Sequence, residues 1–278
     1  MRIRIIDAFT ATPFAGNPAA VCLLDTPGWP AEGWMRRVAA EMNLSETAFA
    51  HPLDGDTEAD WALRWFTPVV ETNLCGHATL ATAHALHVDR GAPGTVRFSS
   101  MSGVLVTHTR ADGTITLDFP AAPVTERPAP EGLAEALGVK PDSTFGTGSL
   151  GDVVAVLPDE ATVRGLTPDF AALAAQARRD GTRGVIVTAA AANSGAEYDF
   201  VSRFFVPDQG IPEDPVTGSA HTALAPYWAA RLGRDETIGL QVSARTGLVR
   251  TRVLGDRVLL TGHAVTVVDG TLHATPNG

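Results

Sequence analysis

The chain has 278 residues, a formal net charge of −10 and 45% hydrophobic residues. This length can bury a large core and favours two domains. The acidic balance, without a cluster of Lys and Arg, argues against nucleic acid as a partner. No apolar run approaches the ~20 residues that a membrane helix needs, and two cysteines in unlike contexts favour a cytoplasmic protein without disulfides.

The first half of the chain shows short apolar and alternating stretches typical of strands. Trp34, Met35 and Val38 recur at helical spacing, whereas the run from His77 to about Val88 is apolar nearly all round and predicts an enclosed helix. Asp112-Gly113 predicts a hairpin turn. The expected strands are 3–9, 19–24, 47–50, 61–66, 95–98, 104–110 and 114–119, and the expected helices are 30–42 and 77–88.

Prolines at 120, 123, 128 and 130 predict a linker over 120–132. The predicted domains are an N-terminal lobe at 1–119 and a C-terminal lobe at 133–278, whose last strands could cross back to the first lobe. The expected strands of the second half are 153–157, 185–188, 198–206, 248–254, 257–261, 265–268 and 271–273, with helices near 133–137, 169–178 and 218–231. Many strands with one enclosed helix in each half indicate an α+β fold, a mostly antiparallel sheet around an apolar helix, rather than alternating βαβ units.

One pattern occurs twice. An aromatic strand that begins at Arg64 is followed by the helix start at Cys75, and one that begins at Arg203 is followed by a loop and a helix start after Asp214. Both pairs are 139 positions apart (203 − 64 and 214 − 75), half of the chain length, although Gly76 and Gly218 would match at an offset of 142. The pattern predicts two diverged copies of one unit.

Each helix start presents unpaired backbone N–H groups and roughly half a positive charge, which suits a carboxylate. Proton-exchanging side chains accompany these donors: Cys75 and His77 in the first copy, Asp214 and Ser219 in the second. If the two helix starts face each other, the expected ligand is a small anionic substrate. Glu46, at the entry to a strand, is a candidate base whose pKa burial would raise.

Five motifs in order resemble the phenazine-biosynthesis PhzF-like family, over residues 1 to about 265. The motifs are Phe14-Ala-Gly-Asn-Pro18, Asn43-Leu-Ser-Glu-Thr-Ala-Phe49, Arg64-x-Phe-Thr-Pro68, Cys75-Gly-His-Ala-Thr79 and Asp214-Pro-Val-Thr-Gly-Ser-Ala220. That family shares its fold with diaminopimelate epimerase and proline racemase. The resemblance implies two similar lobes with the site between them, a homodimer, and neither metal nor organic cofactor.

The resemblance also implies an isomerase that shifts a proton, and so a double bond, in a small unsaturated carboxylate of secondary metabolism. Its catalytic residues would be Glu46, which moves the proton, together with His77 and Asp214. Substrate binding is expected from Asn17, Cys75, Gly76, Gly218 and Ser219.

Other functions stay open. Epimerases of this fold use a cysteine at each helix start; here Cys75 matches one, and Asp214 replaces the other, which puts two-cysteine epimerisation in doubt. A non-catalytic carboxylate-binding protein is a further alternative. Gly218-Ser219-Ala220-His221 departs from the glycine pattern of a serine-hydrolase elbow, so a hydrolase is not expected. His84 and His87 have no third metal ligand nearby in sequence, and structural roles are expected for both.

Overall fold

The computed structural model describes residues 1–55, 58–90, 94–193 and 195–274. Two compact units make up the chain: Met1–Asp118 with Thr261–Gly278 forms the first, and Phe119–Leu260 forms the second. The chain passes from the first unit to the second within β8 (Ile115–Pro120) and returns within β17 (Arg257–Gly262).

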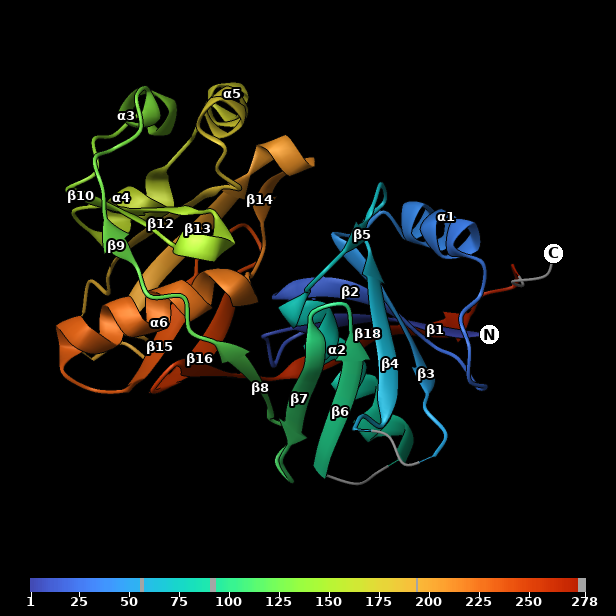
Figure 1. Ribbon diagram of the computed structural model, residues 1–278. Coiled ribbons are helices and arrows are strands. Elements are labelled where there is room, and N and C mark those ends of the chain that lie inside the picture. Colours follow the sequence, from blue (N-terminus) through green and yellow to red (C-terminus); the bar gives the residue numbers. More distant parts are fainter. Residues whose placement is uncertain (56–57, 91–93, 194, 275–278) are drawn as a thin grey trace. The chain divides into compact units, whose positions relative to one another are not determined.

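The first unit is a mixed sheet with two helices (Figure 1). Strands β2 and β3 pair in parallel, as do β4 and β6. The pairs β1–β2, β1–β18, β3–β4, β4–β5, β6–β7 and β7–β8 are antiparallel. Besides its part of β8 and β17, its elements are β1 (Arg2–Ala8), β2 (Asn17–Leu23), α1 (Glu32–Met42), β3 (Glu46–Pro52), β4 (Trp61–Phe66), β5 (Glu71–Thr72), α2 (Gly76–Arg90), β6 (Gly94–Ser100), β7 (Gly103–Thr109) and β18 (Ala264–Thr271).

The end of the chain differs from expectation. Residues 265–268 and 271–273 were expected as two strands, but β18 runs as a single strand that pairs antiparallel with β1. Asp269 and Gly270, expected as a turn, continue this ladder opposite Arg4 and Ile3. Asp269 also pairs with Arg4 and Arg2, so tertiary ion pairs hold a sequence of weak strand propensity extended.

Helix α2 is the enclosed helix that its composition predicts. It packs against β1, β2, β3, β7 and β18, which surround it in Figure 1. Its alanines let the strands approach closely, and its buried hydroxyls need no outside partner. Thr79 and Thr82 donate to the carbonyls of Cys75 and Ala78 four residues earlier, at 2.6 and 2.7 Å.

The second unit has the same kind of sheet with more helices. Besides its part of β8 and β17, its elements are β9 (Thr125–Glu126), α3 (Leu133–Leu137), β10 (Ser143–Gly146), η1 (Gly148–Leu150), β11 (Val153–Val156), α4 (Glu160–Gly165), α5 (Phe170–Asp180), β12 (Val185–Ala190), β13 (Phe200–Val206), η2 (Pro207–Gln209), β14 (Ile211–Asp214), α6 (Gly218–Leu232), β15 (Glu236–Gln241) and β16 (Gly247–Leu254). Residues 120–132, expected as a linker, belong to this unit, where β9 pairs with β10.

Three of these elements, β10, α4 and β15, are not predicted from the sequence, and each omission has a physical reason. Strand β10 has only four residues, and α4 has six, so each is too short to establish a repeating pattern of apolar residues. Strand β15 contains Gly239, which usually weakens a strand. A Cβ at Gly239 would lie 2.5 Å from the Phe200 ring, so close packing explains the glycine.

The two units repeat one pattern of strand pairing. In the first unit β2, β3, β4, β6 and β7 pair successively as parallel, antiparallel, parallel and antiparallel. In the second, β11, β12, β13, β15 and β16 pair in the same sequence. An ion pair also recurs: Arg64 binds Glu71 through Nε and Nη2, and Arg203 binds Glu213 through the same atoms.

No helix among the described residues combines the length and the apolar character needed to cross a bilayer.

Candidate functional site

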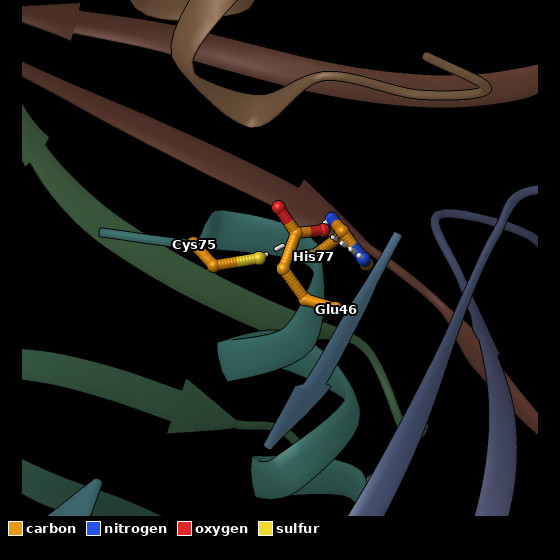
Figure 2. A group of neighbouring side chains, drawn as sticks. All are labelled: Glu46, Cys75 and His77. Atoms are coloured by element: carbon orange, nitrogen blue, oxygen red, sulfur yellow. Dashed lines mark hydrogen bonds and ion pairs between the residues drawn. The ribbon is translucent and has the colours of Figure 1, made fainter. Parts of the chain in front are cut away.

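Three side chains expected at the site come together in the first unit. Cys75 and His77 project from the start of α2, and Glu46 projects from the first position of β3 (Figure 2). His77 Nδ1 lies 3.5 Å from Cys75 Sγ, and His77 Nε2 lies 3.4 Å from Glu46 Oε2. Cys75 and His77 are buried, and the Glu46 side chain is 14% exposed. The cluster therefore joins a thiol, an imidazole and a carboxylate in one nearly dry place.

Burial determines the charge of the imidazole. It lowers the pKa of His77 to about 3, because the protonated ring would lose its hydration. His77 is therefore neutral at neutral pH, with one ring nitrogen as donor and the other as acceptor. The Nδ1 side of the ring lies beside the Cys75 thiol, and the Nε2 side lies beside the Glu46 carboxylate. At 3.4 Å, the contact between Nε2 and Oε2 exceeds the ~2.7–2.9 Å of a charge-assisted hydrogen bond, and His77 Nε2 makes no hydrogen bond among the described residues.

The turn before β2 brings Asn17 to the same end of the sheet. Asn17 is fully buried and stands two residues before Ala19, the residue that pairs with Glu46. Gly16 makes this turn possible. Its φ is +66°, and a Cβ there would lie 2.2 Å from the carbonyl oxygen of Ala8.

The helix start of the second unit is organised around Asp214 and Thr217. The Thr217 hydroxyl donates to the Asp214 carboxylate, and the Thr217 N–H donates to Gln241 Oε1 at 2.9 Å. Gln241 Nε2 in turn donates to the carbonyl of Asp214 at 2.7 Å. These bonds close the loop before Gly218, the first residue of α6, and hold Asp214 nearly buried.

An arginine that the sequence analysis did not single out completes this second helix start. Arg183 Nη2 donates to Ser219 Oγ at 3.1 Å, and Arg183 Nε donates to the fully buried Asp152 carboxylate at 2.8 Å. Because the guanidinium donates to Ser219 Oγ, the hydroxyl keeps its own proton for another acceptor. No motif marks Arg183 or Asp152, since they lie far apart from Ser219 in sequence and meet only through the sheet.

Strand pairing decides the register between the two helix starts. Trp65 pairs with Thr72 just as Phe204 pairs with Asp214, and α2 and α6 both begin at the matched glycine. The offset is 139 in the aromatic strand and 142 at the helix start, because the loop between them is three residues longer in the second unit. The register at 139 for the helix start is therefore wrong: the counterpart of Cys75 is Thr217, and that of Asp214 is Thr72.

The same comparison separates the two starts chemically. Thr47 pairs with Phe66, and Val185 pairs with Phe205, so Thr47 and Val185 are counterparts. Glu46 precedes Thr47 and Gly184 precedes Val185, which makes Gly184 the counterpart of Glu46. A Cβ at Gly184 would lie 2.6 Å from the Phe205 carbonyl oxygen, which leaves no room for a side chain. The carboxylate at this position thus belongs to the first unit alone, and the second start offers a guanidinium and hydroxyls.

Two further histidines lie in packing positions. His84, expected to be structural, has its Nε2 3.1 Å from Thr266 Oγ1. His221 Nδ1 lies 2.8 Å from the carbonyl oxygen of Thr217, and this ring is fully buried beside Phe200.

Solved structures share this architecture. The chain aligns over 97% of its length with 91% of a hydroxyproline epimerase from Agrobacterium vitis at a TM-score of 0.63 and 14% identity, a likeness of fold alone. A PhzF-family phenazine biosynthesis protein from Enterococcus faecalis is nearer, with a TM-score of 0.87 and 40% identity over 98% of this chain and 99% of that one. The fold is therefore one that a PhzF-family protein and a hydroxyproline epimerase share.

Sequence comparison identifies the family. The family model PhzC-PhzF, described as phenazine biosynthesis-like protein, matches residues 6–270. A protein of Pseudomonas aeruginosa described as an uncharacterized isomerase is 46% identical over 269 residues, which cover 96% of this chain and 97% of that protein. The chain belongs to the PhzF-like family, and it is an enzyme of the isomerase type.

Proposed function

We propose that this isomerase moves a proton between carbon atoms of a small unsaturated carboxylic acid, with Glu46 taking up and returning the proton. The supporting observation is the Glu46 carboxylate, 14% exposed and 3.4 Å from a buried imidazole. Burial makes the His77 imidazole a weak base, so the proposal assigns the proton transfer to the neighbouring carboxylate of Glu46. A substrate C–H placed within hydrogen-bond reach of this carboxylate could give up its proton there.

Backbone N–H groups at the start of α2 are suited to stabilise the negative charge that forms on the substrate. Removing a proton from carbon leaves negative charge on the substrate, which fixed N–H groups in a water-poor site stabilise. The first backbone N–H groups of α2, from Gly76 on, have no partner within the helix. Substrate binding by Gly76, Cys75 and Asn17 fits their positions around Glu46.

Asp214, Gly218 and Ser219 of the second unit are proposed to act on substrate as well. The neighbouring Arg183 suits an anionic group, and Asp214 suits an amino or hydroxyl substituent. We also propose that the enzyme acts without a metal or organic cofactor. The proposal includes a homodimeric assembly and a cytoplasmic location. Size-exclusion chromatography with light scattering tests the dimer directly.

Deuterium exchange tests the role of Glu46. A panel of amino- and hydroxy-substituted unsaturated carboxylic acids is incubated in deuterated water with wild type and with Glu46→Gln, and label at carbon is read by NMR. We expect the substitution to reduce exchange by about 10²–10⁴-fold, the usual contribution of a general base. Glu41→Gln, at an exposed position of α1, is the matched control and should exchange like wild type. Undiminished exchange in Glu46→Gln would reject Glu46 as the base.

An epimerase that uses Cys75 is the second candidate, favoured by the thiol's place 3.5 Å from His77. The match of the two helix starts at an offset of 142 argues against this epimerase. The counterpart of Cys75 is then Thr217, which is neither an acid nor a thiol. Cys75→Ser separates the two reactions: an epimerase would lose turnover, whereas the isomerase should retain it. Binding of carboxylic acids with no exchange in any variant would instead indicate a non-catalytic binder.

A further inference from the structure

The cluster at the start of α2 contains one ligand atom each of the three kinds that zinc prefers. A sulfur from Cys75, a ring nitrogen from His77 and a carboxylate oxygen from Glu46 all lie within 4.8 Å of one another. Zinc sites in proteins are built from thiolate, imidazole and carboxylate, and a site with three protein ligands leaves the fourth position to water. Magnesium and calcium prefer all-oxygen sites, so this set of donors selects against them.

The separation of two of these atoms already matches zinc coordination. With Zn–S of about 2.3 Å and Zn–N of about 2.05 Å at a tetrahedral angle, the sulfur and nitrogen stand about 3.5 Å apart. Cys75 Sγ and His77 Nδ1 are 3.5 Å apart. Both residues lie at the start of one helix, so the backbone holds this pair in place.

The carboxylate completes the site with a small movement. Glu46 Oε2 lies 3.4 Å from Nε2, the other nitrogen of the His77 ring, and the ligand atoms of the three residues lie within 4.8 Å of one another. In tetrahedral coordination a carboxylate oxygen stands about 3.4 Å from the nitrogen that binds the metal, so the Glu46 carboxylate must move by about 1 Å toward Nδ1. Figure 2 shows this carboxylate beside the His77 ring. The partial positive charge at the start of α2 opposes a cation, but it also stabilises the thiolate that would bind one.

We propose that Cys75, His77 and Glu46 form a reversible Zn²⁺ site, and that bound zinc inhibits the enzyme by occupying the carboxylate that moves the proton. The binding depends only on the geometry above. The inhibition rests on the proposed function of Glu46, and the two are measured separately.

Binding is tested with Co²⁺ as an optical probe of zinc sites, added to the full chain without substrate. We expect one Co²⁺ per chain, a near-ultraviolet thiolate-to-cobalt band, and displacement of the band by Zn²⁺ but not by Mg²⁺. Cys75→Ser should abolish the band, and Cys22→Ser, which removes the other buried cysteine, should leave it intact. Glu46→Gln should weaken Zn²⁺ binding by at least tenfold. No band in wild type, or a band that persists in Cys75→Ser, would overturn the site.

Alkylation of the wild-type protein tests the site without relying on variants, which could fail to fold. Zn²⁺ should slow the alkylation of Cys75 by iodoacetamide, followed by peptide mass spectrometry, and should leave the alkylation of Cys22 unchanged. Equal rates with and without Zn²⁺ would count against the site. In the deuterium-exchange assay, Zn²⁺ should inhibit and a chelator should restore activity. Binding without inhibition would reject the role of Glu46 in catalysis and leave the metal site standing.

Discussion

Replacing Arg203 by methionine tests how the repeated ion pair supports each unit, because Arg64 provides a matched position. Each guanidinium binds a glutamate through Nε and Nη2 at 2.6–2.8 Å, and each lies 5.0 Å from the centre of a phenylalanine ring. Arg203 Nη1 also donates to the buried carbonyl oxygens of Val163 and Leu166, at 3.2 and 2.8 Å, whereas Arg64 has a second ring, Trp29, 5.5 Å from its guanidinium.

The extra bonds determine the expected magnitude. Losing a partly exposed pair costs about 1 kcal/mol in either unit, and the lost stacking on the ring adds up to about 1 kcal/mol. A buried acceptor left without its donor costs about 1–3 kcal/mol, and Arg203→Met leaves two. We therefore expect a loss of about 3–8 kcal/mol for Arg203→Met and about 1–2 kcal/mol for Arg64→Met. The additional contact of Arg64 with the exposed Glu32, at 3.2 Å, changes little.

Native-state amide hydrogen exchange measures both losses, because it reports the free energy of opening strand by strand. The amides of β12 and β13 should lose protection in Arg203→Met, and those of β3 and β4 should lose less in Arg64→Met. Equal losses in the two variants would show that the bonds to Val163 and Leu166 contribute nothing, and would refute the reasoning.

Two further predictions concern the frame of the site. Gly16→Ala should destabilise the first unit by well over the ~1 kcal/mol of a strained φ alone, because its Cβ would stand 2.2 Å from the Ala8 oxygen. Gly138→Ala is the control: its φ is +71° and the space around it is open, so it should cost only about 1 kcal/mol. Urea unfolding measures both losses. Similar costs would contradict the steric argument. Burial lowers the pKa of His221 to about 4, below the ~6.5 of an unfolded chain, so the unfolded state binds more protons between these values. The contribution of His221 is complete above about pH 6.5 and falls by roughly 3 kcal/mol toward pH 4, and His221→Gln should flatten the fall in urea midpoint across that window. A slope as steep as that of wild type would refute it.

Much of the molecule follows from local sequence. The alternation of Trp61, Leu63 and Trp65 identifies β4, and the apolar run after His77 identifies an enclosed helix, because periodicity reflects which faces are buried. The repeated arginine and aromatic strand indicate the duplication. Glu46 was proposed from its motif, since a short sequence signature keeps its catalytic residue at a constant place.

Tertiary structure alone decided how the two copies correspond and what stands beside each helix start. The three-residue difference between the loops appears only when Thr72 and Asp214 are seen to pair with equivalent strand positions. Arg183 reaches Ser219, and Gly184 takes the place of Glu46, through pairings between distant segments. Local patterns record which way a side chain faces, but the neighbour it meets depends on strand register, which long-range packing sets.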